Sequence, residues 1–368
     1  MRHDDLAREV YGILGIPLDI VDMGTALHRI RSAVATRTPF LVSTANLNFL
    51  ITSQFDTEFR MSLLHSDLCT ADGMPIVWVA RLLGIPIRER VAGADIFAAL
   101  KTTIAPTNRL KVFFFGGAEH VAATACKNVN SESCGVSCVG SFYPGFTPVD
   151  DMSLDAVIEK VNSSRADFLA VALGAVKGQA WLLRNHDRIQ IPVRAHLGAA
   201  INFEAGSVRR APSGMQKSGF EWLWRIKEEP QLWRRYRADG LVFLHLILTR
   251  VVPLKLISLW SRVDSLWRPH GLAIARTDDQ NAVILNLNGV ATADNIAQLV
   301  SGFQEAVAAS KDIVINFRDT RLIDARFVGL LCMLKKHIGR RRLRLSLTDV
   351  PRRIERIFRL NGFQFLLR

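Results

Sequence analysis

The sequence predicts an α/β protein with a mainly parallel sheet in its first part and a smaller α/β domain at its end. Two observations predict this fold class. Short, strongly apolar runs alternate with helical patterns through the first 200 residues, and a second series of the same kind begins near residue 271. Strands this apolar must be covered on both faces by helices, which is the arrangement of parallel sheets.

Each apolar run of the first series ends in small or polar residues. The runs lie at 39–46, 66–73, 110–117, 167–174 and 193–200, with helical patterns at 49–64, 75–83, 121–130 and 179–185. In a Rossmann-like sheet the ligand sits outside the carboxyl ends of the strands. We therefore expect one pocket to gather the five ends, which are Thr44-Ala45-Asn46, Asp72-Gly73, Gly116-Gly117, Gly174 and Gly198.

The second series follows a turn-like linker at 268–271. Strands are expected at 282–289, 312–318 and 343–347, and helices at 292–309, 327–338 and 351–360. This pattern is long enough for a complete small domain. The sequence thus divides into an α/β domain at 1–203, a basic appendage rich in Arg and Trp at 204–270 and a small α/β domain at 271–368.

Positive charge is concentrated in the second half of the chain. Residues 1–203 contain 19 Lys+Arg and 19 Asp+Glu, so the whole net charge of +13 lies beyond them. Residues 202–236 mix Arg and Trp with Glu and Pro; guanidinium groups pair with phosphates and indoles prefer interfaces. Since no helix-turn-helix, zinc-finger or aromatic RNA-binding signature is found, this composition favours an anionic membrane surface over nucleic acid.

The run 241–260 is the candidate membrane segment. His245, Arg250, Pro253 and Lys255 interrupt it, so we expect it to lie in the membrane interface and not to span. After Pro253 the residues Lys255, Ser258 and Arg262 share one helical face, with Leu254, Ile257 and Leu259 turned away. The alternative is a helix packed on the protein's own body.

The cysteines and the N-terminus indicate the compartment. Five cysteines without C-x-x-C spacing are expected to be reduced structural residues of a cytosolic protein. The N-terminus is too polar for a signal peptide, so export is not expected. The cysteines are Cys69, Cys126, Cys134, Cys138 and Cys332.

Nucleotide and metal motifs are few. Gly116-Gly117 resembles the start of a phosphate-binding turn, with a structural glycine pair as the alternative. G-x-G-x-x-G and the P-loop are missing, so no nicotinamide, ATP or other cofactor is predicted. The first 270 residues contain no D-x-D pair for a divalent ion, so arginines and backbone amides are expected to neutralise a leaving diphosphate without a metal.

Two carboxylates have ambiguous roles. Asp72, at a predicted strand end before Gly73, can act as general base or cap the helix from Pro75. Asp95 is expected to cap the helix that begins with I-F-A-A-L.

Seven ordered blocks resemble the WecG/TagA/CpsF family of bacterial glycosyltransferases. They cover about residues 10–238 and read T-A-N-L-N-F-L, A-D-G-M-P, R-V-A-G-A-D-I-F, F-F-F-G-G, L-G-A-V-K-G-Q-A-W, G-A-A-I-N-F-E-A-G-S-V-R-R-A-P and E-W-L-W-R-I-K-E-E-P-Q-L-W-R-R-Y. The resemblance implies transfer of a sugar from a UDP-sugar to an undecaprenyl-diphosphate-linked saccharide at the cytoplasmic membrane, with inversion and without a metal.

The resemblance also implies roles for individual residues. Asp72 matches the base, Thr44 and Asn46 match a polar pair, and Arg90 matches the arginine before the G-x-D block. The residues expected to bind the lipid diphosphate of the acceptor are Arg209, Arg210, Arg225, Arg234, Arg235 and Arg237. Those expected to bind the donor are Gly116, Gly117, Gly174, Lys177, Gln179 and Asn202.

The chain departs from the family pattern in the presumed donor pocket. Ala45 replaces a usual proline, residues 176–179 read V-K-G-Q where P-K-Q-E is common, and Asn202 replaces a frequent aspartate. The particular donor sugar therefore does not follow from the resemblance.

The last 95 residues resemble a STAS domain, the fold of anti-sigma-factor antagonists, through I-V-I-N-F-R-D-T-R-L-I-D-A-R-F-V-G-L-L. Where that family has a D-S-S-G phosphorylation turn, this chain has 324–327 as D-A-R-F, so no phosphoswitch is expected. We therefore expect the STAS-like domain to be a docking module for a protein partner. The basic cluster is either a membrane or partner contact or a solvated helix end, and comprises Lys335, Lys336, Arg340, Arg341, Arg342 and Arg344.

Together with these observations, the family resemblance implies a metal-independent, inverting hexosyl- or N-acetylhexosaminyltransferase. It is expected to act peripherally on the cytoplasmic face of the inner membrane, in exopolysaccharide or cell-surface glycan synthesis. The alternative is a non-catalytic membrane scaffold that binds lipid-linked sugar and recruits partners through the STAS-like domain.

Overall fold

The computed structural model describes residues 4–103, 109–265 and 271–367, and the side chains of most of them. The chain forms two compact units. The first comprises mainly Val21–Val77 and Arg88–Gly240, and the second His3–Ile20, Trp78–Ile87 and Leu241–Arg368. The units therefore do not coincide with the ranges expected from the sequence, because the N-terminal hairpin belongs to the C-terminal unit. The expected linker at 268–271 lies almost entirely outside the described residues.

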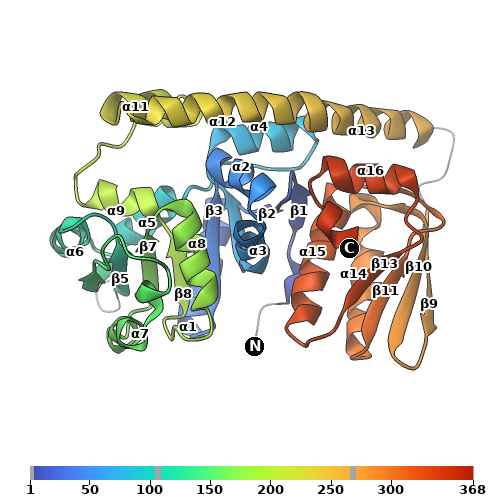
Figure 1. Cartoon of the computed structure of the whole chain (residues 1–368), viewed down its shortest axis with the longest axis horizontal. Coiled ribbons are helices and arrows are strands. Elements are labelled where there is room, and N and C mark those ends of the chain that lie inside the picture. Colours follow the sequence, from blue (N-terminus) through green and yellow to red (C-terminus); the bar gives the residue numbers. More distant parts are fainter. Residues whose placement is uncertain (1–3, 104–108, 266–270, 368) are drawn as a thin grey trace. The chain divides into compact units, whose positions relative to one another are not determined.

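The first unit is built on a six-stranded parallel sheet in the order β4-β3-β8-β7-β5-β6 (Figure 1). Its strands are β3 (Phe40–Ala45), β4 (Leu68–Ala71), β5 (Leu110–Gly116), β6 (Val136–Phe142), β7 (Phe168–Ala172) and β8 (Val193–His196). Neighbouring residues of one strand enter two separate cores, with Phe114 in one and Phe113 in the other. The sheet is thus covered on both faces, as the apolar runs predict.

Helices connect these strands. They are α1 (Met23–Ala35), α2 (Leu47–Phe55), α3 (Thr57–His65), α4 (Met74–Leu82), α5 (Gly93–Thr102), α6 (Val121–Glu132), α7 (Asp155–Ser163), α8 (Ala175–Arg184) and α9 (Gly198–Glu204), with a short 3-10 turn, η2 (Asp151–Ser153). The helix expected at 49–64 is two helices, because Asp56 ends α2 and caps α3 by accepting the Phe59 N–H. The strand β6 was not predicted.

Cysteine pairing corrects the expectation of reduced cysteines. Cys126 of α6 and Cys138 of β6 form a disulfide, whereas Cys69, Cys134 and Cys332 are free. Twelve positions separate the bonded pair, so no short spacing motif signals it.

The appendage is helical. It comprises α10 (Ser213–Ser218), α11 (Glu221–Glu228), α12 (Leu232–Leu246), the π-helical segment η3 (Ile247–Val251) and α13 (Val252–Ser265). Leu232–Ser261 is a 30-residue helix that is long and apolar enough to cross a membrane, judged by length and composition alone, and 17% of its most apolar window is buried.

Part of the expected apolar face of α13 packs on the protein's own body, which is the alternative that the sequence left open. Leu254 is buried and Ile257 is partly buried within the C-terminal unit, whereas Leu259 is exposed as expected. The Arg262 side chain lies outside the described part of the chain. The exposed apolar residues of the long helix recur mostly at intervals of three or four, and they are Leu241, Leu244, Leu248, Val252, Leu256, Leu259 and Trp260. We call this set the outer stripe.

The C-terminal unit has a five-stranded sheet in the order β12-β10-β11-β13, with β9 pairing antiparallel to β10. Its strands are β9 (Leu272–Asp278), β10 (Ala282–Ala291), β11 (Asp312–Asn316), β12 (Thr320–Ile323) and β13 (Leu345–Thr348), and its helices are α14 (Ile296–Ala308), α15 (Ala325–Gly339) and α16 (Arg352–Leu360), with 3-10 turns η4 (Ala293–Asn295) and η5 (Gln364–Leu367). The expected strands and helices are present, and β9 and β12 are additions.

A short N-terminal segment packs on α15. It consists of η1 (Asp5–Ala7) and the hairpin of β1 (Val10–Ile13) and β2 (Ile16–Asp19). Arg326 donates to the carbonyl oxygens of Val10 and Arg8, at 3.1 and 3.2 Å. The contact can be this close because Gly329 has no side chain. A Cβ at this position would lie 2.0 Å from the Val10 carbonyl oxygen.

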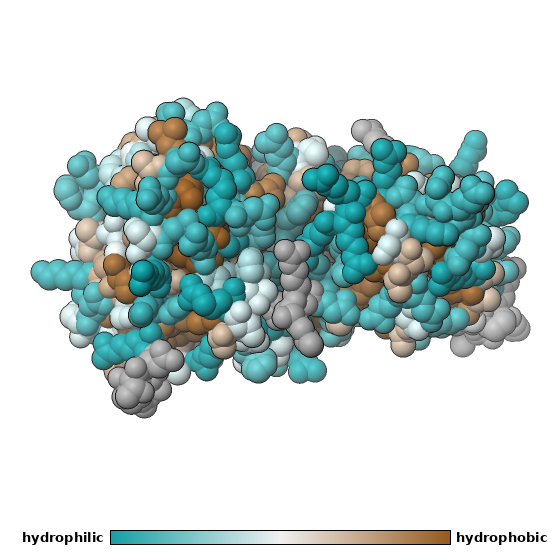
Figure 2. Space-filling model, turned by 90° about the horizontal axis from the view of Figure 1, so that it is seen from below, coloured by the Kyte–Doolittle hydropathy of each residue, from teal (hydrophilic) through white to brown (hydrophobic). Residues whose placement is uncertain are grey.

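Part of the predicted basic cluster is engaged by this segment. Lys336 is only 2% exposed and pairs with Asp5 at 3.1 Å, and Arg340 pairs with the same carboxylate at 2.8 Å. Two cations of the cluster therefore hold the protein's own N-terminal segment. On the face seen in Figure 2, hydrophilic side chains predominate and hydrophobic ones show only in patches between them.

Candidate active site

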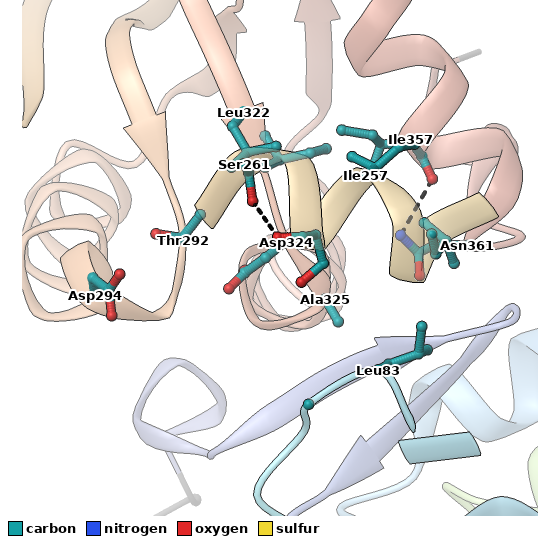
Figure 3. A pocket seen from close by; sticks show the side chains of 14 residues that line it. Leu83, Ile257, Ser261, Thr292, Asp294, Leu322, Asp324, Ala325, Ile357 and Asn361 are labelled. Atoms are coloured by element: carbon teal, nitrogen blue, oxygen red, sulfur yellow. Dashed lines mark hydrogen bonds between the residues drawn. The ribbon is translucent and has the colours of Figure 1, made fainter. Parts of the chain in front are cut away.

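A cavity of about 440 Å³ lies in the C-terminal unit, beside the turn that contains Asp324 and Ala325 (Figure 3). Aliphatic residues such as Leu322 and Ile357 line it together with Asp294 and Asp324, and its described lining contains no Lys or Arg. Asp324 caps α15 by accepting the Phe327 N–H and also accepts the Ala293 N–H, each at 2.9 Å. An acidic lining without cations does not suit an anionic substrate.

A second cavity, of about 460 Å³, lies at the carboxyl ends of the parallel strands in the first unit. All five predicted strand ends contribute to it, as expected. Its lining includes Thr44, Asn46, Asp72, Gly117, Gly174 and Gly198 from these ends, together with Arg90, Arg210, Arg225 and Arg235. Because a carboxylate and several guanidinium groups share this cavity, we take it as the candidate active site.

Asp72 is placed here by the end of β4. Its N–H donates to the Ala45 carbonyl at 2.7 Å, and Gly73 follows with φ of +129°, a conformation that glycine adopts without strain. The carboxylate accepts the Gly93 N–H at 3.2 Å, at the start of α5. Burial raises the pKa of Asp72 to about 6, while Arg90 and the Gly93 N–H oppose the shift. A carboxylate with this pKa is well suited to accept a proton near neutral pH.

The polar pair lies at the end of β3. Thr44 is buried, and a Cβ on Gly93 would lie 3.0 Å from its Oγ1, so Gly93 must be small for α5 to approach. Asn46 caps α2 by accepting the Phe49 N–H at 3.1 Å. Both residues line the cavity with Asp72.

Arg90 is held in an ion-pair network. Its guanidinium donates to Asp95 at 2.8 Å and to Glu221 at 2.9 Å, and Arg210 pairs with the other oxygen of Asp95. The expected capping role of Asp95 is wrong, because α5 begins at Gly93 and its N-cap is Ala92. Asp95 lies in the first turn and orients two arginines.

The six acceptor-side arginines separate into two groups. Arg210, Arg225 and Arg235 line the cavity, and the Nε atoms of Arg210 and Arg225 are buried without a hydrogen-bond partner. Arg209, Arg234 and Arg237 are exposed and lie outside the described lining. Buried guanidinium nitrogens without a partner are unusual, and each of these two N–H groups can donate a hydrogen bond to an anionic oxygen.

The six donor-side residues also separate. Gly117, Gly174 and Asn202 line the cavity. Gly116 packs on β7, where a Cβ would lie 2.5 Å from the Ala172 carbonyl oxygen. Lys177 donates to the Thr147 carbonyl at 3.2 Å, and the buried Gln179 bonds to Ser43 at 3.0 Å. These last three lie outside the described lining.

Three polar residues of the described cavity lining were not singled out from the sequence. Glu221 begins α11, and Asn48 lies in the first turn of α2. His196 ends β8 and bonds to the Leu173 carbonyl at 2.7 Å, and burial lowers its pKa. Their common signal is position: each belongs to a block that ends a strand or begins a helix. Within the described residues, no group of three or more His, Cys, Asp or Glu side chains could hold a metal ion.

The fold and the cavity define an α/β protein whose candidate active site brings the Asp72 carboxylate together with a set of arginines. Residues 11–255 match the model of the "Glycosyl transferase WecG/TagA/CpsF family", and residues 274–368 match that of "Mlab, STAS domain". The chain belongs to the WecG/TagA/CpsF family of glycosyltransferases and carries a C-terminal STAS domain.

Curated relatives agree with the family. A protein of Bacillus spizizenii is 29% identical over 194 residues, which are 53% of this chain and 73% of the relative. A protein of Bacillus subtilis is 26% identical over 195 residues, which are 53% of this chain and 74% of the relative. Both are named N-acetylglucosaminyldiphosphoundecaprenol N-acetyl-beta-D-mannosaminyltransferase.

Proposed function

We propose that this glycosyltransferase transfers a hexosyl or N-acetylhexosaminyl group from a UDP-sugar to an undecaprenyl-diphosphate-linked saccharide, with inversion and without a metal. The main support is the cavity that joins Asp72 to Arg90, Arg210 and Arg225. One carboxylate and several guanidinium groups are what attack by a sugar hydroxyl and departure of a diphosphate require. The names of the two relatives point to the same class of acceptor.

In this mechanism Asp72 takes the proton from the acceptor hydroxyl as that oxygen attacks the anomeric carbon. The bond to the UDP oxygen breaks on the opposite face of the sugar, which inverts the configuration. The negative charge on the leaving diphosphate is stabilised by the Gly117 turn and by arginines at the cavity. The buried, unpartnered Nε atoms of Arg210 and Arg225 offer donors for the acceptor's lipid diphosphate.

We place the enzyme on the cytoplasmic face of the inner membrane as a peripheral protein. The outer stripe exposes seven apolar residues along one helix, and Trp260 among them is 77% exposed. Exposed arginines precede the stripe, with Arg237 over the Trp233 ring at 5.2 Å and Arg235 over the Tyr236 ring at 5.4 Å. Such a helix suits an anionic interface, where a lipid-linked acceptor is found.

The biological product is proposed to be an exopolysaccharide or another cell-surface glycan. The STAS domain is proposed to dock a protein partner through a surface other than the α15 face that the N-terminal hairpin covers. The support for a scaffold without catalysis was the altered V-K-G-Q block. That support is weak, because Lys177 and Gln179 of this block lie outside the described cavity lining.

The deciding experiment measures transfer by the purified protein. A panel of UDP-sugars is combined with a synthetic polyprenyl-diphosphate N-acetylglucosamine acceptor, and products are identified by mass spectrometry. We expect one UDP-sugar to yield a disaccharide with inverted anomeric configuration. Binding of donor and acceptor without transfer or donor hydrolysis across the panel would instead establish the scaffold.

A further inference from the structure

Glu221 is the acidic residue of the appendage that lines the active-site cavity. It is the first residue of α11, and its side chain is 28% exposed. Its neighbours in the lining include Arg210, Arg225 and Arg235, which the proposed function assigns to an anionic substrate. A carboxylate in such a place repels a diphosphate, so its presence calls for a role that offsets this cost.

The ion pair between Glu221 and Arg90 joins two segments 131 positions apart in the sequence. Arg90 is 14% exposed and donates through one terminal nitrogen to Glu221 at 2.9 Å. Its other terminal nitrogen donates to Asp95 at 2.8 Å and to Gln216 of α10 at 3.4 Å. A guanidinium held by acceptors from α5, α10 and α11 has a fixed orientation.

The same network surrounds the carboxylate of Asp72. Arg90 favours its ionised form, whereas Glu221 and Asp95 oppose it, and the Gly93 N–H donates to it. Of these groups, Arg90 lies in the loop before α5, Gly93 and Asp95 belong to α5, and Glu221 belongs to α11. The appendage therefore contributes to the electrostatics of the proposed base through Glu221 and through the arginine that Glu221 holds.

We infer that Glu221 is a positioning residue for sugar transfer, which couples seating of α11 on the α/β domain to the orientation of Arg90 beside Asp72. The inference rests on the proposed function, in which Asp72 is the base. When α11 is seated, Glu221 holds part of the Arg90 charge away from Asp72. Without Glu221 the guanidinium keeps Asp95 and Gln216 as acceptors, but the terminal nitrogen that Glu221 held can donate to Asp72 and make it a weaker base.

The test compares Glu221→Ala, Glu221→Gln and Glu221→Asp by the pH dependence of kcat/KM for transfer. In the Ala and Gln variants a negative charge near Asp72 is lost, so the pKa of Asp72 falls. We expect the acidic limb of the profile to move down by about half a pH unit or more, with a lower kcat, since a weaker base accelerates transfer less. Glu221→Asp keeps the charge and should keep the limb near its wild-type position.

The matched control is Glu228→Gln, which removes the same charge from the same helix outside the described cavity lining. It should leave the limb and kcat unchanged. Donor binding and thermal unfolding show that each variant is folded. The inference would be overturned if the acidic limb stays in place in the Ala and Gln variants, whether the rate is normal or reduced. A reduced rate alone would show only that Glu221 has a structural role.

Failure of the proposed function has a different signature. If Asp72→Asn transfers sugar at the normal rate, Asp72 is not the base, and the wild-type profile has no limb that depends on it. A limb that Asp72→Asn abolishes and Glu221→Ala leaves in place retains the proposed function and rejects the role of Glu221.

Discussion

Asp72 shows how one carboxylate acquires its chemistry from its surroundings. The A-D-G sequence places it after a strand, but its raised pKa depends on burial in a cavity and on groups from α5 and α11. The sequence offered two interpretations of Asp72, as general base and as cap of the helix from Pro75. The carboxylate accepts an N–H at the start of α5, a helix other than the one that follows it, and still lines the cavity.

Replacing Asp72 by Asn should reduce kcat by about 10²-fold or more, the usual scale for loss of a positioned general base. In the wild type, kcat/KM should fall as pH drops below about 6, because the carboxyl is then protonated. The folded-state pKa lies above the unfolded value, so the ionised carboxylate costs stability as pH rises toward 6. The Asn variant should therefore be at least as stable as the wild type at pH 8, and a clear loss of stability there would assign Asp72 a structural role.

Chelation tests the proposed metal independence. Transfer should be unchanged in excess EDTA, because arginines and backbone amides are assigned to the leaving diphosphate. The measurement is the initial rate of transfer with and without chelator. Loss of activity that Mg²⁺ or Mn²⁺ restores would show that the enzyme needs a divalent ion.

At the scale of elements, close packing decides where the N-terminal hairpin lies. Gly12 of β1 and Gly329 of α15 each leave no room for a side chain: a Cβ on Gly12 would lie 2.6 Å from Val328. Neither glycine carries a signal in the sequence, because the contact joins residues more than 300 positions apart. The hairpin was accordingly missed, whereas the periodic helix α15 was predicted.

Changing Gly329 to Ala should lower the thermal unfolding midpoint of the C-terminal unit, since its Cβ would lie 2.0 Å from backbone oxygen that has to shift. Overpacking of this kind costs about 1–3 kcal/mol. The control is Gly339→Ala at the end of the same helix, where a Cβ meets nothing within 4 Å. It should be neutral or slightly stabilising. Equal midpoints for the two variants would contradict the close contact.

The outer stripe makes a second prediction about an element. Changing Leu248 and Leu256 together to Glu places two charges on the apolar face, so binding to anionic vesicles should weaken strongly in a cosedimentation assay. The control is Leu154→Glu, an exposed leucine of the α/β unit. Unchanged binding of the double variant would show that the stripe does not meet lipid.

At the scale of the whole molecule, charge separates the neutral first half from the basic second half. Each Lys or Arg near an anionic surface contributes about 1 kcal/mol, and salt screens this attraction. Part of this positive charge is already engaged within the protein. Lys336 and Arg340 pair with Asp5, and Arg225 pairs with Glu229 at 3.0 Å.

Binding to anionic vesicles should therefore be tight at low salt and weaken as salt is added. Changing Arg234, Arg235 and Arg237 together to Glu should weaken it further, and should reduce transfer to a lipid-linked acceptor more than hydrolysis of the donor. Cosedimentation with neutral and anionic vesicles measures the first effect. Equal binding to both, insensitive to salt and to the triple change, would make the basic excess a solvated surface.

The sequence by itself determined what depends on local pattern. Apolar runs that end in small or polar residues predicted the parallel sheet, and the convergence of Asp72, Thr44, Asn46 and Gly174 on one cavity followed from sheet geometry. The order of the seven blocks indicated the family that the comparison with known proteins shows. These inferences succeed because strand ends and helix periods are properties of neighbouring residues.

Only the tertiary structure decided which distant groups meet. It paired Cys126 with Cys138, joined Glu221 to Arg90, buried Gln179 against Ser43 and laid the hairpin on α15. It also chose which apolar face of α13 is covered and which is exposed. Each of these outcomes depends on packing or ion pairing between residues far apart in the chain, and composition and periodicity carry no signal for such contacts.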